Sequence, residues 1–151
     1  IWAIAYRTPP IKLDSVDNLS GKTVSVERGV SHGMEFDVAR RHLFQVDEDT
    51  ASASARFRKL IAGRCDVLLW GLVQFDRASE LEKYLQKTYI PSLQDPALLG
   101  KTFYVSSKPM FIDSIHLAAK LGRFEDEMTR VDLAIRRARA NGELRRMLQQ
   151  M

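Results

Sequence analysis

One segment constrains the fold more than any other part of the chain, and it runs from Gly21 to His32 with the sequence GKTVSVERGVSH. Its residues 23–27 predict a short buried strand, and Gly29 supplies the tight turn that follows. Ser31 is a good N-cap residue for a helix beyond the turn. A strand that leads through a turn into a helix presents unpaired backbone N–H groups at the carboxyl edge of its sheet, where open α/β sheets bind ligands. We therefore expect a small anion or carboxylate to bind at this turn.

Strands and helices alternate along most of the chain. The predicted strands are 2–7, 23–27, 43–46 and 67–70, and the predicted helices are 31–42, Asp49 or Thr50 to Gly63, and 72–85. Further extended pieces are predicted at 89–91, 102–106 and 110–115. This alternation is typical of βαβ units, so the expected fold class is α/β, with a mainly parallel sheet flanked by helices. The unbroken apolar run at 67–70 predicts a central strand that is covered on both faces.

The end of the chain changes character and predicts a C-terminal helical segment. Apolar residues keep a helical spacing for about four turns, and they are Phe124, Met128, Val131, Ile135 and Ala138. Asn141 and Gly142 interrupt the pattern before a short final helix. Because an apolar stripe on a helix is normally covered, we expect this stripe to need a partner surface.

The composition fits one ordinary domain with a packed core. The 151 residues are 45% hydrophobic and 28% charged, and no apolar run is long enough to cross a membrane. The net charge of +4 would suit a nucleic-acid partner, but the charges are interspersed apart from one arginine-rich stretch near the end, so we expect no nucleic-acid binding. Cys65 is the single cysteine, which excludes an internal disulfide and predicts a buried, inert thiol.

The chain begins at Ile1 with an apolar run that lacks a basic leader and a cleavage site. We therefore expect a processed chain or a piece of a longer one, and the lack of a signal peptide says nothing about export.

Two interpretations fit the turn at residues 28–32. In the first, the backbone N–H groups of Val30 and Ser31, with the Ser31 hydroxyl, surround a ligand carboxylate or phosphate beside Gly29. In the second, the segment is a plain strand-to-helix turn with an ordinary cap. The turn is neither a phosphate loop nor a dinucleotide-binding fingerprint, because the glycine spacing that each of these motifs requires is absent from it.

A second candidate ligand segment is Trp70-Gly71, which ends the apolar strand and falls at the same sheet edge as Ser31. Trp70 is expected either to stack on a ligand or to lie in the core or on the surface of the lobe. His32 directly follows the turn and is either a ligand donor or an exposed surface histidine.

The remaining titratable residues predict no catalytic or metal site. The three histidines do not have a metal-ligand spacing. Residues 47–49 predict a solvated acidic turn. We therefore expect a protein that is not an enzyme and that needs no metal or cofactor.

Several segments together resemble a known family. Residues 13–24 (LDSVDNLSGKTV), residues 28–32 (RGVSH), residues 60–67 (LIAGRCDV) and residues 138–144 (ARANGEL) occur in the order and spacing of the solute-binding proteins of bacterial ABC importers. The resemblance is to the polar amino-acid type, family 3, which has the type 2 periplasmic binding fold. Residues 107–110 (SKPM) also resemble the returning hinge of that family.

The resemblance implies two α/β lobes that close on a ligand between them. It assigns residues 1–10 to a hinge strand, 11–104 to the second lobe, and 105–151 to the returning hinge and to C-terminal helices of the first lobe. The N-terminal part of the first lobe would be absent. The implied partners are a small polar solute and an ABC-transporter membrane permease, in the periplasm. Without the rest of the first lobe, the C-terminal helix would form a homo-oligomer, swap with another chain, or stay partly exposed.

The resemblance also implies ligand contacts from Gly29, Val30, Ser31, His32, Trp70 and Gly71. One position departs from the family pattern. Amino-acid binders usually carry an acidic residue five positions after the aspartate that is Asp66 here, and it holds the ligand ammonium. This chain has Gly71 at that position. The departure favours a different small acid over a plain α-amino acid.

Two other functions share the implied fold. One is the ligand-sensing module of a membrane kinase or transcription regulator, which the neighbouring sequence would identify. The other is a small dehydratase, which would need a charged catalytic group at the pocket edge, where Gly71 offers none.

Overall fold

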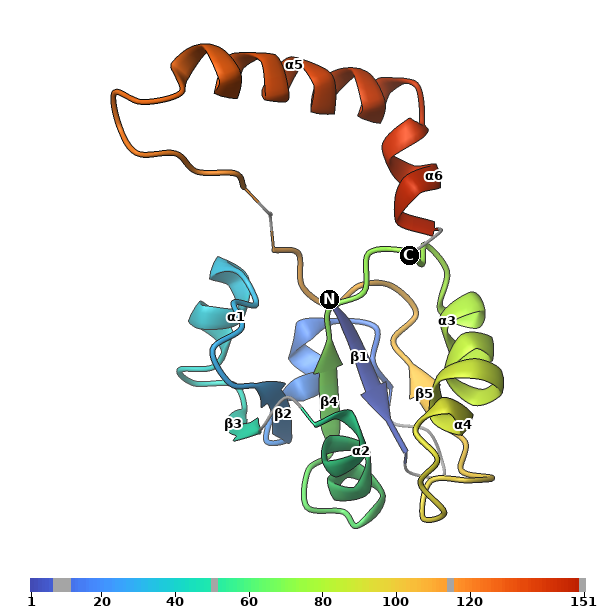
Figure 1. Cartoon of the computed structure of the whole chain (residues 1–151). Coiled ribbons are helices and arrows are strands. Elements are labelled where there is room, and N and C mark those ends of the chain that lie inside the picture. The colour runs from blue at the N-terminus through green and yellow to red at the C-terminus, as the bar shows by residue number, and fades with distance from the viewer. Residues whose placement is uncertain (7–11, 50–51, 114–115, 150–151) are drawn as a thin grey trace. The chain divides into compact units, whose positions relative to one another are not determined.

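The computed structural model describes residues 1–6, 12–49, 52–113 and 116–149. The chain divides into two compact units, Ile1–Asp113 and Ser114–Met151. Unit 1 contains a sheet with its flanking helices, and unit 2 contains the two C-terminal helices (Figure 1). In the described residues, no helix has the length and apolar character to cross a membrane.

The described part of unit 1 forms one five-stranded sheet with the order β3-β2-β4-β1-β5. The strands are β1 (Trp2–Ala5), β2 (Thr23–Glu27), β3 (Gln45–Asp49), β4 (Val67–Trp70) and β5 (Tyr104–Val105). β2 is parallel to both β3 and β4, whereas β1 is antiparallel to β4 and to β5. All strands except β1 therefore run in one direction, which confirms the predicted mainly parallel α/β sheet.

Side chains alternate between two apolar layers, one on each face of the sheet. One layer contains Val24 and Val26 of β2 together with Phe36. The other contains Leu68 of β4 and Phe57, which pack with residues of the later helices. Helices therefore cover both faces, and β4 is a central strand as predicted (Figure 1).

The helical elements of unit 1 connect these strands. They are the 3-10 turn η1 (Val16–Leu19), α1 (Met34–Ala39), α2 (Ala53–Ile61), α3 (Ala78–Tyr84), the π-helical turn η2 (Leu85–Tyr89) and α4 (Ile90–Ser92). η1 falls in the polar connection before β2. Gly63 takes the left-handed backbone after α2, with φ +67°, as the predicted helix end requires.

The first two helices begin later than predicted. α1 starts at Met34 with Gly33 as its N-cap residue, so Ser31 lies outside the helix. α2 starts at Ala53 after Ser52, whose hydroxyl accepts a hydrogen bond from the Ala55 N–H at 3.4 Å. Asp49 is therefore not the cap, and Thr50 lies outside the described residues.

The acidic run after Val46 is part of β3 and not a solvated turn. Asp47 and Asp49 point to the face that α2 covers, and the Nζ atom of Lys59 bridges them at 2.6 and 2.7 Å. The Ser25 hydroxyl donates to Asp49 at 2.8 Å. A lysine that neutralises two carboxylates allows these residues to continue the strand under a helix.

Two predicted extended pieces are wrong. Residues 89–91 are helical, because Pro91 falls in the first turn of α4, where a missing N–H costs little. Residues 110–113 form no strand; Met110 and Phe111 instead donate backbone hydrogen bonds to the Ile1 carbonyl at 2.8 and 3.3 Å. The remainder of that prediction lies outside the described residues.

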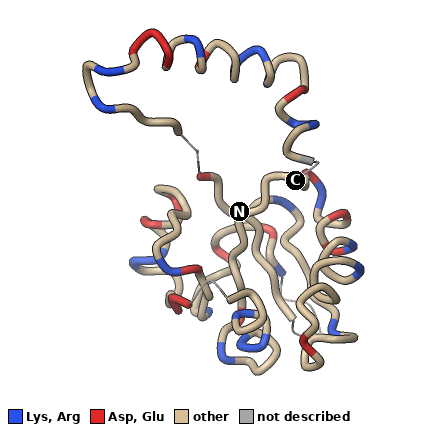
Figure 2. The backbone as a smooth tube through the Cα atoms, in the orientation of Figure 1, with Lys and Arg blue, Asp and Glu red and all other residues tan. Residues whose placement is uncertain are grey.

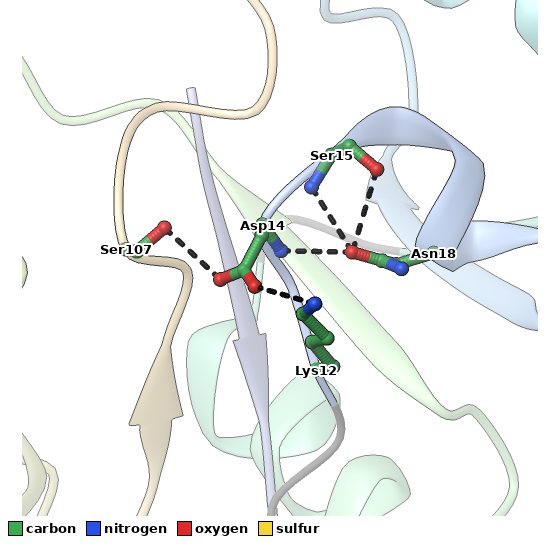
Figure 3. A network of polar contacts seen from close by, with 5 residues as sticks. All are labelled: Lys12, Asp14, Ser15, Asn18 and Ser107. Atoms are coloured by element: carbon green, nitrogen blue, oxygen red, sulfur yellow. Dashed lines mark hydrogen bonds and ion pairs between the residues drawn. The ribbon is translucent and has the colours of Figure 1, made fainter.

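A polar network joins the segment before η1 to the segment after β5 (Figure 3). Asp14 accepts a hydrogen bond from the Ser107 hydroxyl at 3.2 Å and pairs with Lys12 at 3.4 Å. The Asn18 side chain accepts from the backbone N–H groups of Asp14 and Ser15 at 2.9 and 3.1 Å, which fixes the entry to η1.

Unit 2 contains α5 (Glu125–Ala140) and α6 (Glu143–Gln149), as predicted. No residue of α5 is buried among the described residues of the unit, and Val131 and Ile135 are each 38% exposed. The first turn of α5 is acidic and its last turn is basic (Figure 2). The apolar stripe is therefore uncovered within unit 2.

We expect Phe57→Ala to lower the free energy of unfolding by about 3–5 kcal/mol, because removal of a buried ring leaves a cavity. Phe57 is 1% exposed and packs edge-on against Phe103 at 4.9 Å between ring centroids. Urea denaturation followed by circular dichroism measures the change. Leu99→Ala is the control, because Leu99 lies in the same unit and is 54% exposed. Equal effects of the two substitutions would contradict the assignment of Phe57 to the core.

Candidate functional site

The strand order reverses between β2 and β4, which places two loops at one edge of the sheet. From β2 the chain passes through α1 to β3 on one side, then through α2 to β4 on the other side. Because β2 and β4 are parallel, their carboxyl ends meet at the same edge. The loops that follow them, 28–33 and 71–77, contain the residues singled out in the sequence. Ligands bind at such a reversal point in open α/β sheets.

The turn after β2 uses one of the two predicted amide donors. The Val30 N–H donates to the Glu27 carbonyl at 3.3 Å, and Gly29 has φ +78°, as a type II turn requires. The Val30 amide is therefore occupied in this conformation, although its side chain is 50% exposed. The Ser31 N–H has no hydrogen-bond partner in the described part of the chain. It is the amide donor that remains.

The Ser31 hydroxyl and Gly33 close the turn. The hydroxyl accepts a hydrogen bond from the Gly33 N–H at 3.3 Å, so Ser31 caps the loop itself and not the helix. A Cβ atom on Gly33 would lie 2.5 Å from the Ile112 carbonyl oxygen, and the φ of Gly33 is +86°. Only glycine meets both requirements without strain. The segment after β5 therefore holds the turn in place.

His32 is buried, so its interpretation as an exposed surface histidine is wrong. The residue is 6% exposed, and its ring lies on Phe36 with the centroids 4.8 Å apart. Burial lowers the pKa of His32 from its usual 6.5, while a backbone hydrogen bond with Val30 acts in the opposite direction. The imidazole therefore packs against the core beneath the turn and supports it there.

Trp70 and Gly71 occupy the other loop. Trp70 is half-buried, and its ring packs on Tyr89 at 4.4 Å and edge-on against Phe57 at 5.7 Å between centroids. Part of Trp70 therefore packs on the core, as one of the two interpretations expected, while the rest borders the edge, and its stacking on a ligand stays a prediction. Gly71 is exposed, and a Cβ atom there would meet nothing within 4 Å.

The sequence reasoning missed three residues at this edge, namely Glu27, Arg56 and Tyr89. Arg56 is 5% exposed, and its Nη2 donates to the Leu69 carbonyl at 2.7 Å. Its Nη1 lies 3.7 Å from the Glu27 carboxylate. The Arg56 Nε is buried and has no partner in the described structure. Burial lowers the pKa of Arg56, and the carboxylates of Glu27 and Asp49 oppose that shift.

One signal could have found Arg56. It occurs next to Phe57 on the helix face that also carries Ala53 and Leu60. A charged residue at an inward helical position usually has a buried partner.

Other candidate centres in the described structure lie apart from the two loops. One hollow of about 580 Å³ is lined by residues that include Tyr6, Gly63 and Lys101, outside the edge described above. A second, of about 520 Å³, lies on α2, where Arg58 and Lys59 are already paired with carboxylates. No group of three metal-ligating side chains occurs among the residues described. Burial raises the pKa of the Cys65 thiol to about 11, so the thiol is protonated at neutral pH.

Solved structures share the fold of this chain, although no family model and no curated protein sequence matches it. An arginine transport-system periplasmic binding protein from Legionella pneumophila has a TM-score of 0.59 and 16% identity over 98% of this chain and 59% of its own. An amino-acid ABC transporter substrate-binding protein from Streptococcus pneumoniae, bound to L-arginine, has a TM-score of 0.57 and 15% identity over 98% of this chain and 54% of its own.

A third structure is the second substrate-binding domain of GlnP from Lactococcus lactis in an open conformation. Its TM-score is 0.50, with 18% identity over 97% of this chain and 56% of its own. The chain therefore spans a little more than half the length of the proteins whose fold it shares.

Burial of His32 predicts a pH-dependent stability. The lowered pKa keeps the folded imidazole neutral below pH 6.5, where the unfolded chain takes up a proton. The contribution of the buried, neutral His32 to the free energy of unfolding is thus complete above pH 6.5. It declines as the pH falls from 6.5 towards the lowered pKa of the folded state. We expect His32→Leu to lose less unfolding free energy than the wild type between pH 7.5 and 5.5 in urea titrations. The exposed His42→Leu variant is the control and should keep the wild-type pH dependence. An unchanged slope in His32→Leu would contradict the assignment.

Proposed function

We propose that unit 1 is the ligand-binding lobe of a solute-binding protein that serves an ABC importer. The ligand is a small polar solute with a carboxylate group. It is bound by the loop of Gly29, Val30, Ser31 and His32 from one side and by Trp70 and Gly71 from the other. In this proposal the Ser31 N–H donates to the carboxylate, Val30 and Trp70 provide contact surface, and His32 supports the loop.

One observation carries the proposal, namely that the two candidate segments meet at the point where the strand order reverses. The candidate segments are separated by β3 and α2 in the chain, yet they end neighbouring parallel strands. The fold likeness adds support, since the similar proteins are described as a periplasmic binding protein of an arginine transport system, a substrate-binding protein of an amino-acid ABC transporter and a GlnP substrate-binding domain.

The proposed mechanism is hinge closure over this edge. An open edge holds a small ligand weakly until a second surface covers it, and ligand binding then favours the closed state that a membrane permease would recognise. We propose 1–10 and the start of 105–151 as the hinge segments, 11–104 as the lobe, and the periplasm as the location. The hydrogen bond from the Ser107 hydroxyl to Asp14 would join the returning hinge segment to the start of the lobe.

We propose binding without chemistry at this edge. Neither Ser31 nor His32 is arranged as a nucleophile with its base: the Ser31 hydroxyl accepts from the Gly33 N–H, and the His32 ring lies on Phe36. The Glu27 carboxylate lies beside Arg56 and not beside a group that would form an acid–base pair with it.

Substitution of Ser31 tests the proposed site. Titration of the chain with L-leucine, followed by two-dimensional ¹⁵N NMR, should shift the amide signals of the two loops. Ser31→Pro removes the hydroxyl and the free N–H, so we expect it to weaken binding at least about tenfold, whereas Ser31→Ala should weaken it less.

Ser20→Ala is the control, because Ser20 is exposed and precedes β2, at the end of that strand opposite to the loop at 28–33. Wild-type affinity in Ser31→Pro, with the fold retained, would contradict the assigned donor.

For the apolar stripe of α5 we propose a second copy of this chain as the partner. The acidic first turn, which includes Glu125 and Glu127, would face the basic last turn of the other helix, with Arg137 and Arg139, in an antiparallel pair. Two such helices would bring opposite charges together at both ends and cover the stripe in the middle.

We expect sedimentation velocity to show a dimer that Val131→Glu weakens at least about tenfold, because the charge falls in the buried seam. Leu133→Glu is the matched control, since Leu133 is 48% exposed but lies off the stripe. A monomeric wild type, or equal weakening by both substitutions, would contradict this pairing.

A further inference from the structure

We propose that Glu27 is the cation-binding group of this site, so that the ligand carries a positively charged nitrogen as well as a carboxylate. This inference rests on the proposed function, because it assigns a second anchor to the same edge. It also replaces the expectation, drawn from the lack of an acid at Gly71, that a different small acid is favoured over a plain α-amino acid. The acidic group that binds the ligand nitrogen would come from β2, the strand next to β4.

The strand register places Glu27 beside the second ligand loop. Val24 pairs with Val67 and Ser25 with Leu68 in the parallel ladder of β2 and β4. Carried two residues further, the same register sets Glu27 level with Trp70. Partners across neighbouring strands point to the same face, so the Glu27 carboxylate and the Trp70 ring share one face of the sheet edge.

The Glu27 carboxylate has unused capacity to accept hydrogen bonds. Its side chain is 38% exposed, and it forms an ion pair with Arg56 Nη1 at 3.7 Å, which is too long for a hydrogen bond. Arg56 Nη2 already donates to the Leu69 carbonyl at 2.7 Å. No donor in the described part of the chain hydrogen-bonds the Glu27 carboxylate, so a ligand N–H⁺ group would find its acceptor sites open.

The charges between α2 and the sheet also favour a cation. The face carries three carboxylates, of Glu27, Asp47 and Asp49, against two cations, Arg56 and Lys59. Lys59 is shared by the two aspartates, which leaves the layer with one excess negative charge. Glu27 is the most exposed of the three acids. The next residue, Arg28, lies on the exposed turn, where solvent screens its charge.

Aromatic rings border the same place. Trp70 and Tyr89 lie 4.4 Å apart between centroids, and both are half-buried. The face of a tryptophan or tyrosine ring attracts a cation, and the attraction grows when water is excluded. Gly71 leaves open space beside Trp70, so a nitrogen can approach the carboxylate and the ring together.

The two anchors together define the ligand class. The free Ser31 N–H receives a carboxylate and Glu27 receives an ammonium, so the site selects a small zwitterion. The exposed Val30 and Val73 side chains, 50% and 61% exposed, border the loops and accommodate an apolar portion. A simple carboxylic acid would use only one of the two anchors.

Three probes of one carbon skeleton separate the anchors in ¹⁵N NMR titrations of the 151-residue chain. L-leucine carries both charges, 4-methylpentanoate only the carboxylate, and 3-methylbutylamine only the ammonium. We expect L-leucine to bind about tenfold more tightly than 4-methylpentanoate, because a charge-assisted contact is added. Glu27→Gln should reduce that preference to less than about twofold and leave the affinity for 4-methylpentanoate unchanged.

Glu48→Gln is the matched control. Glu48 also lies on a strand of this sheet and forms a 3.7 Å ion pair with an arginine, Arg40, but it pairs with Val26 and so belongs to the opposite face. It should keep the wild-type preference for L-leucine. The spectrum of each variant without probe shows whether its fold is retained.

The outcomes separate this inference from the proposed function. If 4-methylpentanoate shifts the Ser31 amide but the wild type does not prefer L-leucine, the role of Glu27 is overturned and the carboxylate site stands. The same holds if Glu27→Gln keeps the full preference. If no probe shifts either loop, both the site and the role of Glu27 are overturned. The wild-type comparison alone decides the matter should Glu27→Gln fail to fold.

Discussion

The parallel pairing of β2 with β4 is the constraint on which the rest of the structure depends. It makes β2 the neighbour of both β3 and β4, so the chain has to cross from one side of β2 to the other. Because of this crossing, no loop joins the carboxyl end of β2 directly to the carboxyl end of β4. The free Ser31 amide, the Trp70 ring and the Glu27 carboxylate all follow from that single pairing, because each is at or just beyond a strand end.

A charged layer under α2 maintains this arrangement at some energetic cost. Most of the sheet buries apolar residues, but α2 meets β2 and β3 through Arg56, Lys59 and three carboxylates. A buried guanidinium loses hydration, and one hydrogen bond to the Leu69 carbonyl with a long ion pair to Glu27 offsets only part of that loss. Groups left with incomplete contacts at a sheet edge are typical of functional sites. The layer thus ties the stability of the lobe to the charge state of the proposed ligand surface.

The sequence predicted the strands more closely than the loops and helix ends, and the reason is physical. The strand at residues 23–27 is a local apolar pattern and matches β2 residue for residue. The start of α1 depends on the contact of Gly33 with Ile112, which comes from a distant segment, so local capping at Ser31 gave the wrong helix start. Asp47 and Asp49 join a strand only because Lys59 lies above them.

The candidate site was predicted in part. The sequence predicted its two loops because each one follows a predicted strand, and the structure brings them to one edge of the sheet. Glu27, Arg56 and Tyr89 depend on tertiary contacts and were missed, although a charged residue on the inward face of α2 was a signal for Arg56. The burial of His32 likewise comes from its contact with Phe36, which no local pattern contains.

The central claim is that the loops after β2 and β4 form one binding surface. Intermolecular nuclear Overhauser effects between L-leucine and the isotope-labelled chain test it most directly. The account predicts that one bound molecule gives contacts both to the Ser31 amide and to the Trp70 indole protons. Contacts confined to one loop, or found instead around Tyr6 and Lys101, would contradict it.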